Sequence, residues 1–205
     1  MLAYLLHSLL LTVQGVAAAQ YAEYILAPES RTILPARIHR VNGTVSNAQS
    51  LISSTNGTAF LEGNSSITFD YEKNIGGVVS ITVSSVSLLD AIIGVTLTES
   101  SLWINGAACD ATADAGLDTP LWLSVGAGSG TYTVPREFDR GAFRYLSIVS
   151  NSSASIEIRS VAVQYTAAPT QDLRSYTGYF HSNDDLLNRI WYAGESSGHI
   201  VVAEY

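Results

Sequence analysis

Short runs of alternating or β-branched residues recur along most of this chain, and they predict antiparallel strands. Clusters rich in glycine, asparagine and serine separate several of the runs, as expected of the turns between such strands. Seven short strands indicate a mainly β chain folded as a jelly-roll-like antiparallel β-sandwich. The predicted strands cover residues 66–71, 78–83, 92–98, 121–125, 131–134, 143–149 and 155–165.

The last of these strands contains an irregularity. Ile156 and Ile158 occupy even positions, whereas Val161 and Val163 occupy odd ones. Successive side chains of a strand point to opposite faces, so these four residues share one face only if the strand bulges or bends. We place that bulge near Ser160.

The hydrophobic period changes from two residues to 3.6 near the C-terminus. Leu186, Leu187, Ile190 and Trp191 recur at helical spacing and predict a helix over 182–194. A helix of this length is marginal alone in water, so an apolar stripe on it implies a partner surface. That surface would lie beyond this chain, or in a second copy of it.

Polar residues mark the start of the predicted helix. Ser182 and Asn183 are candidate caps, and Asp184 and Asp185 fall in the first turn, where the helix dipole favours negative charge. We therefore interpret both carboxylates as structural rather than catalytic.

Breaks in the pattern suggest a division of the chain into segments. The sandwich is predicted over 20–166, because the strand pattern ends at Tyr165 and Pro169 would interrupt a ladder. A linker at 167–181 then leads to the helix over 182–194. The remaining residues, 195–205, continue neither the apolar stripe nor a strand pattern, and we read them as an atypical tail.

The N-terminus has the features of a secretory leader. An apolar run over 2–13 is followed by three alanines at 17–19, which predicts a signal peptide over 1–19 and a mature start at Gln20. The run is too short to anchor the protein in a membrane. Four sequons fit passage through a glycosylating pathway, so we expect a secreted, extracellular protein. The candidate acceptors are Asn42, Asn56, Asn64 and Asn151.

Cysteine usage and charge limit the chemistry further. Cys109 is the only cysteine, so it is either free and buried or paired with a residue outside this chain. A formal net charge of −8 without a cluster of Lys or Arg excludes nucleic acid and anionic membrane surfaces as partners.

Three sets of residues carry a family resemblance. Residues 69–79 run Phe-Asp-Tyr-Glu-Lys-Asn-Ile-Gly-Gly-Val-Val, and residues 178–191 place Gly-Tyr-Phe-His-Ser-Asn-Asp ahead of the helical stripe. The third set comprises 98–106, 109–118 and 139–146. Together they resemble the N-terminal part of fungal-type secreted α-L-rhamnosidases of glycoside hydrolase family 78, with the likeness running over about 24–194.

This resemblance implies both a fold and an activity. The first and third sets look like the accessory sandwich of the family, with Glu72 where glycine is usual, and 178–191 looks like the entry into an (α/α)6 barrel. Family members hydrolyse terminal α-L-rhamnosyl bonds with inversion, using two carboxylates on the barrel. We expect this chain to be truncated at the start of that barrel and inactive alone, with no catalytic residue, cofactor or metal assigned.

Several acidic and imidazole side chains are candidate site residues. Asp110, Asp114 and Asp118 recur every four residues and could ligate a hard cation, but their spacing fits no EF-hand and solvated loop acids explain them better. His39 and His181 lack a neighbouring nucleophile pattern, so the sequence supports no catalytic triad.

Two tryptophans are the candidate sugar-contact residues. Trp103 and Trp122 could offer aromatic platforms to a sugar ring, but each lies within a strand-like apolar run, which favours a place in the core.

The sequence thus leaves three functional hypotheses. The first is the accessory sandwich of a rhamnosidase-like enzyme acting on rhamnose-containing glycans or glycosides, and the second is a stand-alone carbohydrate-binding module. The third is a structural fragment that self-associates through Leu186, Leu187, Ile190 and Trp191.

Overall fold

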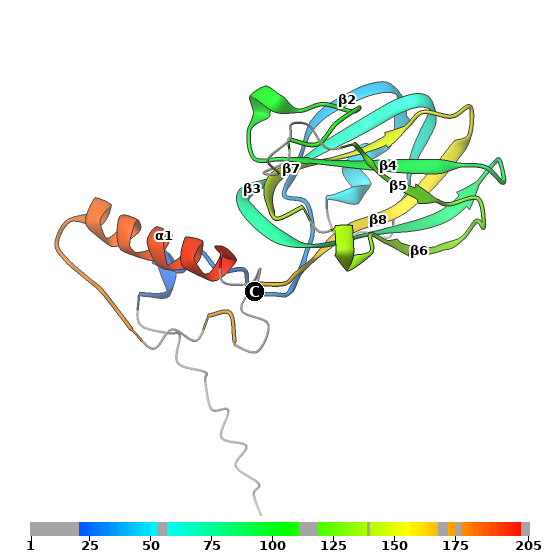
Figure 1. Cartoon of the computed structure of the whole chain (residues 1–205). Helices are drawn as coiled ribbons and strands as arrows, with labels where there is room; N and C mark the ends of the chain where they lie inside the picture. The colour runs from blue at the N-terminus through cyan, green and yellow to red at the C-terminus, as the bar shows by residue number, and fades with distance from the viewer. Residues whose placement is uncertain are drawn as a thin grey trace, which may run out of the picture.

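The computed structural model describes residues 21–52, 57–110, 119–138, 140–167, 172–174 and 178–201, with side chains up to residue 194. It confirms a mainly β chain followed by one α-helix (Figure 1). The strands are β1 (Thr32–Ile33), β2 (Arg37–Ser46), β3 (Ala59–Val86), β4 (Ile92–Thr98), β5 (Leu121–Ser124), β6 (Gly130–Thr133), β7 (Ala142–Ser150) and β8 (Ser155–Tyr165). The helices are η1 (Ala22–Tyr24), η2 (Ala48–Leu51), η3 (Ser101–Trp103), η4 (Arg136–Phe138) and α1 (Asp185–Val201).

The strands form one antiparallel sheet that curls into a β-sandwich, because the long strand β3 belongs to both layers. The middle of β3 lies between β2 and β7, and β7 continues the layer through β4 to β5. The last part of β3 lies between β6 and β8, and β8 also pairs with β1. In the described residues, β2 and β5 are therefore the edges of one layer, and β6 is an edge of the other.

Strand β3 corrects one prediction from the sequence. Residues 66–71 and 78–83 were predicted as two strands joined by a turn at 74–77, but the structure makes them one continuous strand. The turn-forming residues instead produce an irregular register between Asp70 and Ile75, with Glu72 in the left-handed region at φ 63°. The chain therefore passes from one layer to the other here and reverses its direction, because residues 65–76 follow β7 from Ser150 to Ala142 and residues 77–86 follow β8 back from Tyr165 to Ile156.

Strand β8 carries the bulge that its alternation predicted. Thr82 pairs with Ser160, and the next residue, Val83, pairs with Ile158, so Arg159 is the extra residue on β8. The buried positions change parity across this point, and Ile158 and Val161 both face the core. The predicted position of the bulge, near Ser160, is confirmed.

The core lies between the two layers and is built from the inward positions of the central strands. Their side chains are 0–2% exposed, which is the dense packing that a fold without a disulfide requires. Cys109 is fully buried, and its thiol donates to the carbonyl oxygens of Val95 at 3.9 Å and Thr119 at 3.8 Å. The largest apolar contributors from the strands are Leu61, Ile67, Phe69, Ile81, Ile93, Phe143, Leu146, Ile148, Ile156 and Ile158.

The first described residues, 21–27, pack against the C-terminal helix (Figure 1). Tyr24 stacks on Tyr192 with ring centroids 5.6 Å apart, and its hydroxyl donates to Asp185 at 3.1 Å. Arg174 donates to the carbonyl oxygens of Ala27 at 2.8 Å and of Ala22 at 3.1 Å. Residues within the predicted linker thus anchor the N-terminal segment against α1.

Helix α1 differs from the sequence prediction at both ends. Its N-cap is Asp184, whose carboxylate accepts hydrogen bonds from the amides of Leu186 at 2.9 Å and Leu187 at 3.4 Å. The hydroxyl of Ser182 accepts a hydrogen bond from the amide of Asp184 at 3.1 Å. The helix continues to Val201, so most of the predicted atypical tail is helical. Asp185 forms an i,i+4 ion pair with Arg189, which agrees with a structural role for this carboxylate.

The face of α1 that packs inward is not the predicted apolar stripe. Asn188 and Tyr192 are buried, whereas Leu186, Leu187 and Ile190 are 64%, 49% and 57% exposed. Three of the four stripe residues are therefore open to solvent, whereas Trp191 is partly buried and contacts Phe180 and Tyr192. Over the residues described, no helix is both long and apolar enough to cross a membrane.

Candidate functional site

A groove of about 320 Å³ runs beside the edge strand β5. Strand β5 forms one wall, and the end of β6 with the following turn η4 forms the other. Tyr132 of β6 stabilises the loop that connects the two walls, because its hydroxyl donates to the carbonyls of Gly128 and Val125 in the loop between β5 and β6. The groove is lined by residues 119–124, Thr133, Val134, Pro135, Phe138 and Arg140.

Two exposed aromatic rings belong to this groove. Trp122 is 42% exposed and Phe138 is 46% exposed, from opposite walls. Trp122 lies over Gly94 of the neighbouring strand, where a Cβ atom would come within 2.7 Å of the indole ring. The absence of a side chain at Gly94 therefore allows the indole to lie close against the sheet. Sequence reasoning missed Phe138, because it follows a proline outside any strand pattern.

The tryptophans are not core residues, so the interpretation favoured by their surrounding apolar runs was wrong. Trp103 is 62% exposed, on the short helix η3 after β4. Ser100 caps this helix by accepting from the amide of Leu102, which leaves Leu102 and Trp103 facing outward. Trp103 is not among the residues that line the groove, so the structure separates the two candidates.

The chemistry available in the groove is that of binding. Hydroxyl groups of Thr119, Ser124 and Thr133 and the guanidinium of Arg140 lie among apolar and aromatic side chains. The described lining residues include no carboxylate. Inverting hydrolysis of a glycosidic bond requires an acid and a base carboxyl about 6.5 to 9.5 Å apart, and the groove walls supply neither.

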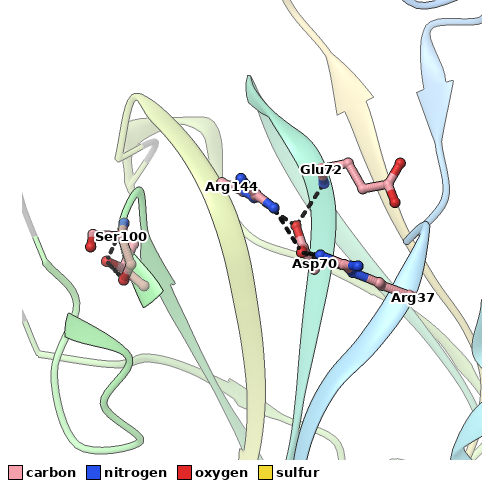
Figure 2. Close-up of polar contacts among 6 residues, drawn as sticks. Arg37, Asp70, Glu72, Ser100 and Arg144 are labelled. Carbon is pink, nitrogen blue, oxygen red and sulfur yellow. Dashed lines mark hydrogen bonds and ion pairs between the residues drawn. The ribbon is translucent and has the colours of Figure 1, made fainter. Parts of the chain in front are cut away.

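A second site, made of charged residues, is centred on Asp70 (Figure 2). This buried carboxylate accepts from Arg37 at 2.6 and 3.0 Å, from Arg144 at 2.8 and 3.0 Å, and from the Glu72 amide at 2.7 Å. Burial by itself would raise the pKa of Asp70, but these hydrogen bonds outweigh it and hold the pKa well below its usual range.

The Asp70 site is structural in character. Arg37 belongs to β2 and Arg144 to β7, so the carboxylate joins the two neighbours of β3 just before β3 bends. The backbone conformation of Glu72 favours glycine, and its amide bond to Asp70 helps to hold it there.

The remaining candidates are dispersed. Asp110 accepts a hydrogen bond from Thr98 at 3.2 Å, and Asp114 and Asp118 lie outside the described residues. The part of the chain that the structure describes contains no group of three or more potential metal ligands. His39 contacts Tyr145 edge-on, and His181 stacks on Tyr21.

The candidate glycosylation sites fall on the surface where they are described. Asn42, Asn64 and Asn151 are all exposed. Asn56 lies outside the described residues.

Comparison with solved structures places this fold among proteins that include carbohydrate-active ones. A GH78 family rhamnosidase of Bacillus sp. GL1 matches with a TM-score of 0.56 and 18% identity over 73% of this chain. The rhamnosidase from Klebsiella oxytoca with rhamnose bound (TM-score 0.44, 15% identity, 73% of this chain and 33% of that one) and a fucolectin from striped bass, Morone saxatilis (0.41, 16%, 61% and 44%), are less similar. Their lower scores do not establish a shared fold.

No protein-family model and no curated protein matches this sequence. The match to the Bacillus enzyme covers only 15% of that enzyme's length. At 18% identity this likeness is evidence of architecture and not of activity. The chain therefore shares the fold of one β-sandwich segment of a GH78 family rhamnosidase.

Proposed function

We propose that this chain is the accessory β-sandwich of an α-L-rhamnosidase-like glycoside hydrolase, and that it binds carbohydrate in the groove between Trp122 and Phe138. The observation that carries the proposal is the pair of partly exposed rings on opposite walls of one groove, with hydroxyl groups and a guanidinium between them. Sugar rings present apolar C–H faces, which the two aromatic rings complement. They also present polar hydroxyl edges, which the hydroxyl groups and the guanidinium complement.

The accessory part of the proposal is supported by the unit that α1 forms with the N-terminal segment. This unit is held by Tyr24 and Arg174, and it presents Leu186, Leu187 and Ile190 to solvent. An exposed apolar face of this kind favours a larger assembly over a stand-alone module. A secreted, extracellular location is part of the same proposal, since rhamnose-containing glycans would be its partners.

A second part of the proposal concerns activity. The groove contains no carboxylate among its described residues, so we expect binding without hydrolysis. Release of rhamnose from an aryl α-L-rhamnoside, in proportion to the concentration of the purified chain, would contradict this part. Release of rhamnose would not bear on binding in the groove, which a separate experiment tests.

Calorimetric titration of the full chain with L-rhamnose and rhamnose-containing oligosaccharides tests the binding. We expect Trp122→Ala and Phe138→Ala each to weaken binding roughly tenfold or more, since partly buried aromatic contacts contribute about 1–2 kcal/mol. Trp103→Ala is the matched control, because this exposed tryptophan lies outside the groove, and it should bind as the unmodified protein does. Equal affinity in all four proteins, or loss only on changing Trp103, would refute the groove as the binding site.

A further inference from the structure

Three of the four sequons, which are far apart in sequence, come together on neighbouring strands. Asn42 lies on β2 and Asn64 on β3, and Asn151 directly follows β7. The register pairs Asn42 with Ser66, and it pairs Ser65 with Ser150.

Direct contacts confirm how closely the three segments approach. The side-chain amide of Asn42 donates to Ser66 at 3.2 Å, and Ser66 is itself the hydroxyl residue of the Asn64 sequon. At Gly43 a Cβ atom would lie only 2.3 Å from the carbonyl oxygen of Asn64. Neighbouring strands are about 4.8 Å apart and residues along a strand about 3.3 Å apart, so the three asparagine Cα atoms lie within roughly 12 Å of one another.

Each of these asparagines meets the local requirements of an acceptor. All three are exposed. Each has a hydroxyl residue two positions later, namely Thr44, Ser66 and Ser153. The glycines at 43 and 63 have positive φ angles, and the pairing of β2 with β3 shifts register between Asn42 and Thr44.

The sequon cluster borders the most exposed edge of the sandwich. Strand β2 is ten residues long and pairs only with β3, so its other side presents unpaired backbone groups in the described structure. Eight of its ten residues are exposed. A long exposed edge of this kind can pair with the edge of another copy unless something covers it. Asn42 lies near the middle of β2 and therefore in the best position to carry such a cover.

We propose that Asn42, Asn64 and Asn151 carry N-linked glycans, and that these glycans together cover the β2 edge and prevent copies of the chain from pairing there. In each transfer, the asparagine Nδ2 forms a bond to the anomeric carbon of a lipid-linked oligosaccharide. The bond from that carbon to the lipid pyrophosphate breaks, and one amide proton passes to a base of the host transferase. The remaining N–H of Asn42 can still donate to Ser66. This proposal is independent of sugar binding in the groove.

The test uses the full chain secreted from a eukaryotic host behind a heterologous leader, so that it does not depend on residues 1–19. Peptide mass spectrometry should find all three asparagines predominantly glycosylated. Two triple variants remove the sites in different ways. Asn42→Gln with Asn64→Gln and Asn151→Gln replaces the acceptors, whereas Thr44→Val with Ser66→Ala and Ser153→Ala keeps the asparagines and removes only the hydroxyl residues.

Both triple variants should lose the same glycan mass and show a several-fold rise in the oligomeric fraction by light scattering. Enzymatic removal of the glycans from the folded, unmodified protein should give the same rise, which covers the case in which a variant fails to fold. Predominantly unmodified asparagine at any of the three sites would overturn the assignment. Complete loss of the glycans with no rise in association would overturn their role as a cover.

Discussion

The ion-pair site at Asp70 allows the most quantitative prediction. The change is Asp70→Asn, which keeps the shape of the side chain and removes its charge. Asp70 accepts five hydrogen bonds, four from guanidinium groups and one from the Glu72 amide. An asparagine would place an NH2 group where an oxygen accepts now, so donors would face donors.

The magnitude follows from the exposure of the partners. Breaking a fully buried ion pair by removing one partner costs about 3–5 kcal/mol. Here the side chains of Arg37 and Arg144 are 56% and 34% exposed, so both guanidinium groups can regain water. We therefore expect Asp70→Asn to lower the free energy of unfolding by about 2–3 kcal/mol, which corresponds to a fall in Tm of roughly 5–10 °C for a chain of this size.

The assay is urea unfolding at a series of pH values. The pKa of Asp70 is depressed in the folded state, so its charge stabilises the fold fully above the ordinary carboxyl pKa of about 4. This contribution is lost as the pH falls below that value toward the folded-state pKa. The stability difference between the unmodified protein and Asp70→Asn should thus be constant near neutral pH and narrow below about pH 4.

Asp185→Asn is the matched control for this experiment. It also breaks an aspartate–arginine pair, but Asp185 and Arg189 have side chains 60% and 71% exposed, so we expect a change below about 0.5 kcal/mol from the ion pair. Equal effects of the two substitutions, or a difference at Asp70 that does not depend on pH, would refute the reasoning.

Three further predictions concern the bend, the groove and the helix. Glu72→Gly should raise the free energy of unfolding by about 0.5–1 kcal/mol in urea titrations, because Glu72 has a φ of 63°, whereas a decrease would show that its side chain matters more than its backbone. Gly94→Val should displace the Trp122 indole and weaken glycan binding in calorimetry, and unchanged affinity would mean that the position of the indole is not important. Leu187→Glu combined with Ile190→Glu should remove concentration-dependent association in sedimentation, and association that persists would exclude this face.

The sequence predicted the strands of the core well and the exposed strand poorly. Alternation reveals strands with one buried face, and most of the strands that the pattern predicted are of this kind. Strand β2 was missed, because eight of its ten residues are exposed and no alternation marks it. The cluster at 74–77 does mark a reversal of the chain, but composition does not show that strand pairing continues through it and that it joins the two layers instead of two paired strands.

The groove was only partly predictable for a related reason. Trp122 lies in an apolar run, and its place on the surface depends on the edge position of β5 and on the absence of a side chain at Gly94, over which the indole lies. Phe138 and Arg140 reach the groove from a turn, and only the three-dimensional structure brings them to β5. The helical tail was missed because residues 195–201 extend a helix whose start is already capped, and an extension of this kind needs no apolar stripe of its own.

The most direct test of the proposed function is to follow the indole N–H signals of the protein by NMR during titration with L-rhamnose. The chain contains three tryptophans, and single Trp→Phe variants assign their signals to Trp103, Trp122 and Trp191. Sugar binding in the groove predicts that the Trp122 signal shifts in a saturable way while the signals of Trp103 and Trp191 stay in place. No shift, or a shift confined to Trp103, would contradict the account.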